Sequence, residues 1–163
     1  MEKYHPVVEK IKNLLTEKGY WFETFEHAPV RTSEEAAALR PNYTLSQGSK
    51  ALIIRAKKNS EKFFAMVVVP GDKRFDTKKL KEGFGLADLR FATEAEVHEI
   101  TGGVQPGGVP PFGTLFNIPV YADEGIFENE KIIFNAGDRS FSIGMLSKDY
   151  DAIVSPAHGS FTV

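Results

Sequence analysis

The stretch ALIIRAKKNSEKFFAMVVV, residues 51–69, decides the fold. Its two halves, ALIIRAK (51–57) and KFFAMVVV (62–69), are short, apolar and rich in β-branched or aromatic residues, and the polar turn KNSE separates them. This pattern is typical of two strands joined as a hairpin. We therefore predict a buried β-hairpin here, at the centre of the sheet.

Helix-forming patterns surround the hairpin. Apolar residues at helical spacing, or capping residues at the start, mark five segments. In chain order they are VVEKIKNLL (7–15), EEAAALR (34–40), DTKKLKEGFG (76–85), TEAEVHEI (93–100) and SKDYDAIV (147–154). The expected N-terminal caps are Thr32 or Ser33, Asp76, Thr93 and Ser147, with Glu35 and Glu96 completing capping boxes. The expected ends of the first two helices are Gly19 and the residue before Pro41.

We predict strands in the remaining apolar segments. They are YWFETF (20–25), residues 89–92 and 118–122, and a pair within KIIFNAGDRSFSIGM (131–145) joined at residues 135–139. Turns connect the strands as often as helices do, which favours antiparallel pairing. The sequence therefore predicts an α/β fold: a single domain over residues 1–163, with a mixed, mostly antiparallel sheet surrounded by short helices.

The composition excludes several classes of protein. The chain has 163 residues, no cysteine and a formal net charge of −2. Without cysteine there is no disulfide framework, thiolate nucleophile or cysteine-based metal site. No apolar run approaches the roughly 20 residues that span a bilayer, and the N-terminus lacks the features of a signal peptide. We therefore expect a soluble, cytoplasmic protein in which any contact with nucleic acid is local.

The familiar catalytic motifs are missing from the sequence. The four histidines, His5, His27, His98 and His158, include no pair at the HExxH spacing, so we expect no metal site. No serine occupies a GxSxG turn, which argues against a Ser-His-Asp hydrolase. GSK (48–50) has no first glycine of a phosphate-binding loop before it and leads into a strand. We therefore expect no metal and no cofactor.

Two residues are candidates for a site. Lys50 comes immediately before the predicted buried strand, where a charge must reach the surface or meet an anion. It can be a point charge for a phosphate or an oxyanion, or a lysine that extends to solvent at a strand start. His27 follows a predicted strand and precedes Pro29 by two residues. It can line a cleft, or it can fix that turn through a backbone hydrogen bond.

Glycine and proline are concentrated in TGGVQPGGVPPFGT, residues 101–114. Five glycines and three prolines fall between Thr101 and Gly113. A linker has this composition in order to bend, and a ligand loop has it so that backbone N–H groups can approach a substrate. The position of the loop inside one predicted domain argues against a linker.

Five basic residues form a second cluster, between Lys73 and Lys81. Such a run is typical of a solvated helix face. It is also compatible with a local contact to an RNA backbone, which would weaken as salt is added. Both interpretations stay open.

Several stretches together resemble the YbaK and prolyl-tRNA-editing family of aminoacyl-tRNA deacylases. They are TFEHAPVRTSEEAA (24–37), SQGSKALII (46–54), FAMVVVPGDKRFDTKKL (64–80), ATEAEVHEITGGVQPGGVPPFG (92–113) and FNAGDRSFSIGM (134–145). They follow the order of the family and cover most of the chain, so the resemblance is far more specific than any single motif. It implies one α/β domain around a mixed, mostly antiparallel sheet, in agreement with the residue patterns.

The resemblance implies a freestanding enzyme that hydrolyses the ester between a wrong amino acid and the 3′-terminal adenosine of tRNA, assisted by a ribose hydroxyl of that adenosine. Such editing is needed because a synthetase pocket gains only about 1–3 kcal/mol from one methylene. The implied catalytic residues are Lys50, Gly107 and Gly108. The lysine would neutralise the terminal phosphate or orient the ester, and N–H groups of the 107–109 segment would stabilise the oxyanion. The implied substrate-binding residues are Phe25, His27, Gly103, Val109, Pro110, Gly113 and Ser142.

The implied partners are the acceptor end of a mischarged tRNA and an aminoacyl-tRNA synthetase such as prolyl-tRNA synthetase, with no membrane and no DNA. The amino acid stays open among small ones such as Ala, Ser, Cys and Pro. Some cysteinyl-tRNA-clearing relatives carry Tyr in place of Phe25 and an acid in place of Ser142. Two other functions stay open: a non-catalytic module that docks on a synthetase or a tRNA, and a sensor of a free amino acid or nucleotide.

Overall fold

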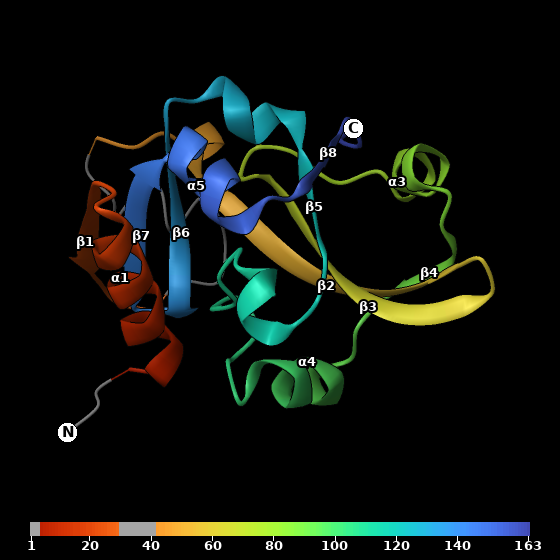
Figure 1. Cartoon of the computed structure of the whole chain (residues 1–163), viewed down its shortest axis with the longest axis horizontal. Coiled ribbons are helices and arrows are strands. Elements are labelled where there is room, and N and C mark those ends of the chain that lie inside the picture. Colours follow the sequence, from red (N-terminus) through yellow and green to blue (C-terminus); the bar gives the residue numbers. More distant parts are fainter. Residues whose placement is uncertain (1–3, 30–41) are drawn as a thin grey trace.

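The predicted hairpin forms the middle of a five-stranded sheet. In the computed structural model, which describes residues 4–29 and 42–163, strand β2 (Ser49–Lys58) pairs antiparallel with β3 (Glu61–Pro70) along its whole length (Figure 1). The strand order in this sheet is β4-β2-β3-β5-β8. Both hairpin strands are interior, which confirms the prediction.

The remaining strands of this sheet are short. They are β4 (Ala87–Phe91), β5 (Val120–Asp123) and β8 (Ala157–Gly159). β4 pairs antiparallel with β2, whereas β3 with β5 and β5 with β8 pair in parallel. The sequence did not predict β8, because three residues are too few to show an alternating pattern.

A three-stranded antiparallel sheet, in the order β1-β7-β6, stands beside the larger one (Figure 1). Its strands are β1 (Phe22–Glu26), β6 (Lys131–Asp138) and β7 (Phe141–Leu146). A parallel bridge between Gly48 and Ile133 connects the two sheets. The predicted α/β fold with mixed, mostly antiparallel pairing is confirmed.

The connection between β6 and β7 lies later than predicted. We expected it at residues 135–139, but β6 continues to Asp138, which pairs with Phe141. The register shifts between Asn135 and Asp138, and Gly137 within this step has a φ of 114°. Such a φ is accessible to glycine, so the strand passes through the irregular step and pairing resumes.

Four of the predicted helices are present in the described residues. They are α1 (Pro6–Lys18), α3 (Thr77–Phe84), α4 (Glu94–Thr101) and α5 (Ser147–Val154). Short 3₁₀ turns occur as η1 (Leu45–Gln47), η2 (Gly113–Phe116) and η3 (Glu124–Glu128). The helix predicted at 34–40 and its caps lie outside the described residues. Within the described ranges, no helix is long and apolar enough to cross a membrane.

The helix ends match the predicted caps with one exception. Gly19 ends α1 in the left-handed conformation, and the Asp76 carboxylate accepts hydrogen bonds at the start of α3. Ser147 does not cap α5, as predicted, but is its first residue. Its hydroxyl donates to the Asn129 carbonyl instead, so it ties the helix to the preceding 3₁₀ turn.

Helix α1 covers one face of the three-stranded sheet (Figure 1). Its apolar residues are buried in the main core together with alternate residues of the sheet. These residues are Val7, Val8, Ile11, Leu15, Ile132, Phe134, Ala136, Phe141, Ile143 and Met145. Because side chains alternate across a strand, the residues between them belong to the opposite face, where the predicted site residues lie.

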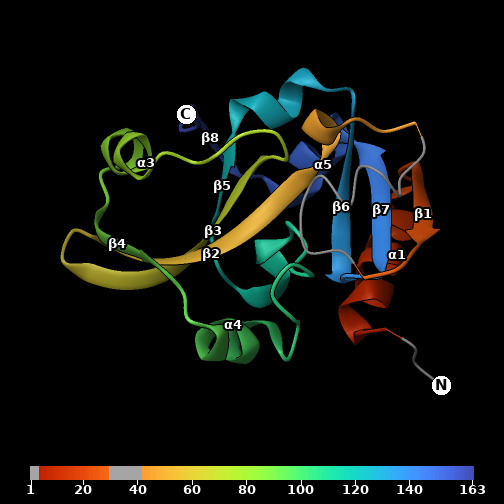
Figure 2. The same ribbon diagram turned by 180° about the vertical axis from the view of Figure 1, so that it is seen from behind.

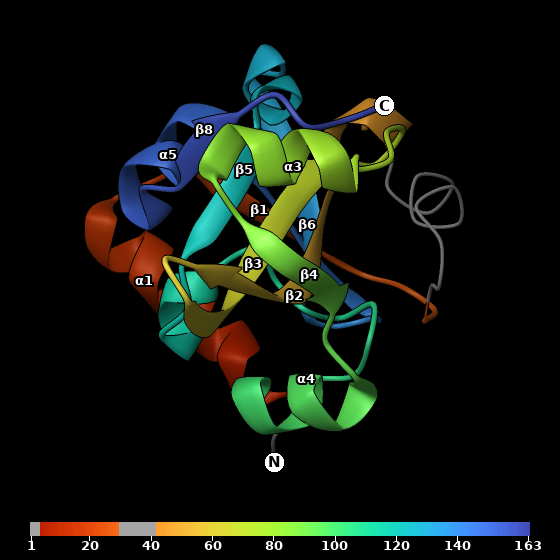
Figure 3. The same ribbon diagram turned by 90° about the vertical axis from the view of Figure 1, so that its right-hand side faces the viewer.

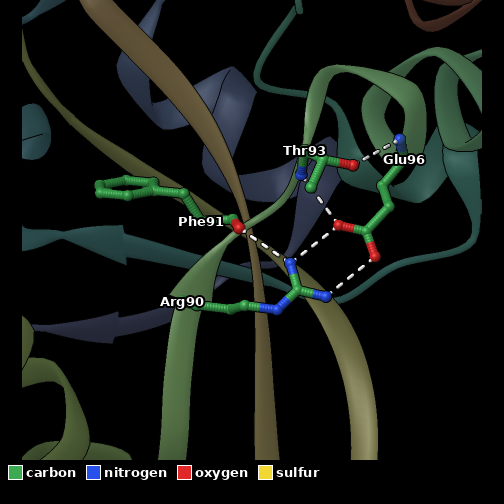
Figure 4. A network of polar contacts seen from close by, with 4 residues as sticks. All are labelled: Arg90, Phe91, Thr93 and Glu96. Carbon is green, nitrogen blue, oxygen red and sulfur yellow. Dashed lines mark hydrogen bonds and ion pairs between the residues drawn. The ribbon is translucent and has the colours of Figure 1, made fainter.

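A polar network fixes the start of α4 against β4 (Figure 4). The Arg90 guanidinium donates two hydrogen bonds to the Glu96 carboxylate, at 2.8 and 3.0 Å, and one to the Phe91 carbonyl. Glu96 also accepts from the Thr93 backbone N–H, and the Thr93 hydroxyl accepts from the Glu96 N–H. The predicted capping box is therefore confirmed and extended by an arginine.

The charge of Glu96 is expected to stabilise the protein in a pH-dependent way. Arg90 and the Thr93 N–H lower the pKa of this carboxyl from 4.5 to about 2. Because the pKa is lowered on folding, the contribution is complete above pH 4.5 and disappears as the pH falls toward 2. Glutamine keeps the capping box but removes the charge, so Glu96→Gln should lower the free energy of unfolding at pH 7.

Urea unfolding of the wild type and of Glu96→Gln at pH 7, 4.5 and 3 measures this contribution. The difference between the two proteins should narrow at pH values below 4.5. A difference that stays constant from pH 7 to pH 3 would show that the carboxylate charge is not what stabilises this helix start.

Candidate active site

One face of the three-stranded sheet carries three polar or aromatic residues in a row. Phe25 of β1 lies opposite Ser142 of β7, and Ser142 lies opposite Asn135 of β6. Residues directly opposite one another share a face of a sheet, so the three side chains project to the same side. This is the face away from α1, and Figure 2 views it from that side. Two of the three are predicted site residues, and Asn135 is new.

The bridge between the sheets sets Lys50 on the same side. Gly48 and Ile133 pair in parallel, so Lys50 and Asn135 each lie two residues further along their strands. Side chains two residues apart point the same way. Lys50 is the second residue of β2, is half-buried, and has no ion pair within the described part of the chain. It is therefore a cation without a protein counter-ion on the face of Asn135 and Ser142.

A chain of polar contacts joins this face to the Gly/Pro loop. His27 Nε2 lies 2.7 Å from Ser142 Oγ, which donates to Asn135 Oδ1 at 3.3 Å. Asn135 Nδ2 in turn donates to the Gly107 carbonyl at 2.6 Å. His27 Nδ1 lies 2.9 Å from the Ala28 carbonyl, which only accepts, so this nitrogen carries a hydrogen. The Ala28 contact agrees with the expectation that His27 fixes its turn, and the Ser142 contact connects His27 to the polar face of the small sheet.

Further contacts hold the Gly/Pro loop against the protein. The Gly137 N–H donates to the Gly108 carbonyl at 2.8 Å, and the Tyr150 hydroxyl donates to the Pro111 carbonyl at 2.6 Å. Arg139 donates to the Gln105 side chain at 2.8 Å. The second half of the loop, Val109 to Gly113, is buried. The loop is therefore fixed on β6, the β6–β7 turn and α5, unlike a linker.

The N–H groups of the loop differ in availability. The Gly108 N–H donates to the Gln105 carbonyl at 2.9 Å, so it closes a turn and is not open to a substrate, contrary to our expectation. The N–H groups of Gly107 and Val109 have no such bond among the described residues. Gly107 has a φ of 86°, a conformation that L side chains rarely adopt. Gly107 and Val109 therefore remain the candidate donors.

The other predicted loop residues lie at the end of α4 or are packed against neighbouring parts of the protein. Gly103, with a φ of 98°, follows the end of α4. Pro110 is buried. A Cβ on Gly113 would lie 2.6 Å from Val120 Cγ2, so this glycine allows close packing of the loop on β5. A Cβ on Gly108 would come within 3.3 Å of the Asp138 backbone, so this glycine lets the loop approach the β6–β7 turn.

The structure adds Tyr43 to the site. Its ring makes an edge-on contact with Phe25, at 5.9 Å between centroids, and its hydroxyl occupies the space where Gly144 has no side chain. Burial and the neighbouring Glu23 carboxylate raise the pKa of Tyr43, so its hydroxyl stays protonated. Tyr43 lies outside the stretches that resemble the family, and Asn135 lies within one of them (134–145) without a role assigned to it from the sequence. Only the strand register and the chain contacts bring them to the candidate site.

The model of the aminoacyl-tRNA editing domain family matches residues 27–153. The chain belongs to this family. The match includes most of the residues described above, from His27 through Lys50 and the Gly/Pro loop to Ser142. The resemblance drawn from the sequence motifs is thereby confirmed.

Two relatives show how aminoacyl-tRNA editing domains occur in longer and shorter proteins. The multifunctional Ser/Thr-tRNA deacylase ProXp-y of Escherichia coli is 31% identical over 149 residues, which cover 91% of this chain and 88% of the relative. The proline–tRNA ligase of a Sulfurihydrogenibium species is 31% identical over 129 residues, but these cover only 22% of the ligase. The chain thus matches nearly a whole deacylase and one part of a synthetase.

Solved structures of similar fold agree with the family. A crystal structure of a protein proposed to be a trans-editing enzyme for prolyl tRNA synthetase superposes with a TM-score of 0.83 and 25% identity, covering 99% of both chains. The crystal structure of hypothetical protein APE2540 gives a TM-score of 0.80 and 27% identity over 94% of this chain. The editing-domain fold therefore extends over nearly the whole chain.

Proposed function

We propose that the protein is a freestanding aminoacyl-tRNA deacylase that removes a wrong amino acid from tRNA. The observation that carries this proposal is the match to ProXp-y, which spans 88% of that Ser/Thr-tRNA deacylase. The polar face with Lys50 beside a fixed Gly/Pro loop supports it, because the reaction needs a cation and backbone donors around one ester. As a partner we propose the acceptor end of a mischarged tRNA, in the cytoplasm.

The proposed reaction is hydrolysis of the ester between the amino acid and the terminal ribose. Water forms a bond to the carbonyl carbon and loses a proton, the carbonyl oxygen becomes an oxyanion, and the bond to the ribose oxygen then breaks. The ribose oxygen takes up a proton, so the products are a free amino acid and an uncharged tRNA. A neighbouring ribose hydroxyl positions the water, which fits a site built without a cysteine nucleophile.

Lys50 and the loop have separate roles in this proposal. Lys50 neutralises the terminal phosphate or orients the ester, as an unpaired cation on the face where the substrate binds. The N–H groups of Gly107 and Val109 donate to the oxyanion, and one such donor contributes about 3 kcal/mol to transition-state stabilisation. Gly108 and Asn135 do not contact the ester in this proposal. They hold the loop in place.

We propose a small amino acid as the group that is removed. Phe25, His27 and Ser142 stand together on the site face, and Ser142 is fully buried there. From the sequence we considered Ala, Ser, Cys and Pro. The Ser142 hydroxyl is already bonded to His27 and Asn135, so it does not decide the substrate. The match to ProXp-y, a Ser/Thr-tRNA deacylase, supports seryl and threonyl esters as the preferred substrates, and we propose these.

A panel of mischarged tRNAs tests the function directly. Purified protein is incubated with tRNAs that carry Ala, Ser, Thr, Cys or Pro, and the release of each amino acid is followed. Turnover of a small amino acid, fastest with Ser or Thr, supports the proposal. Binding of tRNA without release on any member would identify a non-catalytic module. Tight binding of a free amino acid without release would identify a sensor.

A synthetase partner, such as prolyl-tRNA synthetase, is a further part of the proposal. The match of the chain to one segment of proline–tRNA ligases supports it, since a separate domain can supply in trans what such a ligase carries within its own chain.

A further inference from the structure

A basic cleft lies toward the outer end of the β2–β3 hairpin, and Figure 3 views the molecule from this end. It has a volume of about 240 Å³. Its lining residues are Arg55, Ala56, Lys57, Lys62, Asp88 and Arg90. Four of these side chains are cationic and one is acidic, in a protein whose net charge is −2. Positive charge is therefore concentrated here.

The strand register places like charges opposite one another in this cleft. Arg55 of β2 lies opposite Arg90 of β4, and Lys57 of β2 lies opposite Lys62 of β3. Like charges in directly opposed positions destabilise a sheet. The arrangement therefore costs stability in the free protein, and an anion that binds among the strands would relieve the repulsion.

Two of the four cations are held by carboxylates, and two are not. Lys57 pairs with Asp88 at 3.2 Å, and Arg90 belongs to the capping network of α4. Arg55 and Lys62 take part in no ion pair within the described ranges. These two side chains are therefore available to a ligand.

The spread of charge fits a polyanion better than a single small ion. Three neighbouring strands contribute the cations, and a strand spacing of about 4.8 Å spreads them across about 10 Å. A nucleic acid duplex carries one charge per roughly 1.7 Å of its axis, so it presents several phosphates over this distance. We propose that the cleft binds the phosphate backbone of the tRNA substrate, at a part of the molecule away from its terminal nucleotides.

The strand geometry explains why a different part of the tRNA is involved. Lys50 and Arg55 are five residues apart on β2, about 17 Å along the strand, and an odd separation puts them on opposite faces. The terminal nucleotides cannot occupy both places. β4 is the edge strand beside β2, so RNA bound near Lys50 can extend around this edge to the cleft (Figure 3).

This inference rests on the proposed deacylase function, which supplies the RNA partner, and its test does not require hydrolysis. The double variant Arg55→Gln, Lys62→Gln removes the two unpaired cations and leaves both carboxylate contacts intact. The matched control is Lys10→Gln, Lys18→Gln, which removes two exposed charges from α1 at the far side of the molecule. Binding of fluorescently labelled, unfractionated uncharged tRNA is measured by anisotropy from 50 to 300 mM salt.

The cleft variant should bind tRNA about 10-fold or more weakly at low salt, and the slope of log K against log salt should fall by about 2, one for each lost phosphate contact. The control should retain the wild-type affinity. Thermal unfolding should show the cleft variant as stable as the wild type or slightly more so. Binding of the trinucleotide CCA, which models the terminal nucleotides, should be unchanged.

Three results would overturn the inference: wild-type affinity and slope in the cleft variant, an equal loss in the control, or no measurable tRNA binding by the wild type. The outcome is separate from that of the mischarged-tRNA panel. If no amino acid is released from the panel but the cleft variant alone loses tRNA binding, the deacylase function fails and the cleft assignment stands.

Discussion

Replacing Lys50 with alanine is expected to lower kcat/KM for deacylation by about 100-fold or more, the size of effect seen when one group that stabilises a developing charge is removed. The ammonium group has no ion pair in the described residues, so the protein does not use its charge for folding. Its position on the face of Ser142 and Asn135 points to use by a substrate. Release of amino acid from the preferred member of the mischarged panel measures the effect.

Lys58→Ala is the matched control, because it makes the same change at the other end of the same strand, at an exposed position. Its kcat/KM should stay within about twofold of the wild type, since a single exposed charge contributes little. Thermal unfolding of both variants checks that the fold is retained. Wild-type activity in Lys50→Ala would remove Lys50 from the proposed mechanism. An equal loss of activity in Lys58→Ala would mean that Lys50 contributes only general electrostatic attraction of RNA.

The parts of the fold that the sequence predicted depend on residues close together in the chain. The hairpin of residues 51–69 has its turn and both apolar runs within 19 positions, and the capping box of Thr93 and Glu96 needs only four. Such patterns can be recognised in the sequence because the groups that contact one another in the fold are already close together in the chain. β8 could not be predicted in this way, since its three residues become a strand only by pairing with β5.

In the candidate site, too, contacts between residues that are distant in the sequence could not be predicted. Lys50 stands out in the sequence by its place before a buried strand and the loop by its composition, and the family resemblance gives both a role. Asn135 has no such signal, because its partners Ser142 and Gly107 lie 7 and 28 residues away. The basic run between Lys73 and Lys81 drew attention as a compact cluster. The cations of the basic cleft are spread from Arg55 to Arg90 and come together only when three strands pair. The pairing register of the strands, which no short motif encodes, decides the position of Asn135 and brings the cations of the basic cleft together.

Replacing Asn135 with alanine is the second change with a large expected effect. The variant loses the 2.6 Å hydrogen bond to the Gly107 carbonyl, and Gly107 belongs to the segment whose N–H groups we propose as oxyanion donors. An oxyanion forms only in the transition state, so kcat should fall while KM changes little. A loss of about 10- to 100-fold corresponds to about 1.4–2.8 kcal/mol of transition-state stabilisation.

Two further variants separate this positioning role from a loss of stability. Asn129→Ala also removes an amide that donates to a backbone carbonyl, but this is the carbonyl of Ser46 in η1 and not one of the Gly/Pro loop. Each alanine variant should lower the free energy of unfolding by about 1 kcal/mol, the usual net value of one hydrogen bond, and only Asn135→Ala should lower kcat. Asn135→Asp keeps the shape of the side chain, but a carboxylate cannot donate to the Gly107 carbonyl, so it should be as damaging as alanine.

Measured together, kcat, KM and urea unfolding of the three variants decide whether Asn135 positions the loop. If Asn129→Ala loses as much activity as Asn135→Ala, the effect follows stability and not position. If Asn135→Asp is fully active, the donated hydrogen bond is irrelevant. A fall in kcat confined to the two Asn135 variants would mean that the face of the small sheet acts on the ester through the loop. The chain of contacts from His27 through Ser142 and Asn135 ends at the carbonyl of Gly107, whose own N–H is a proposed oxyanion donor.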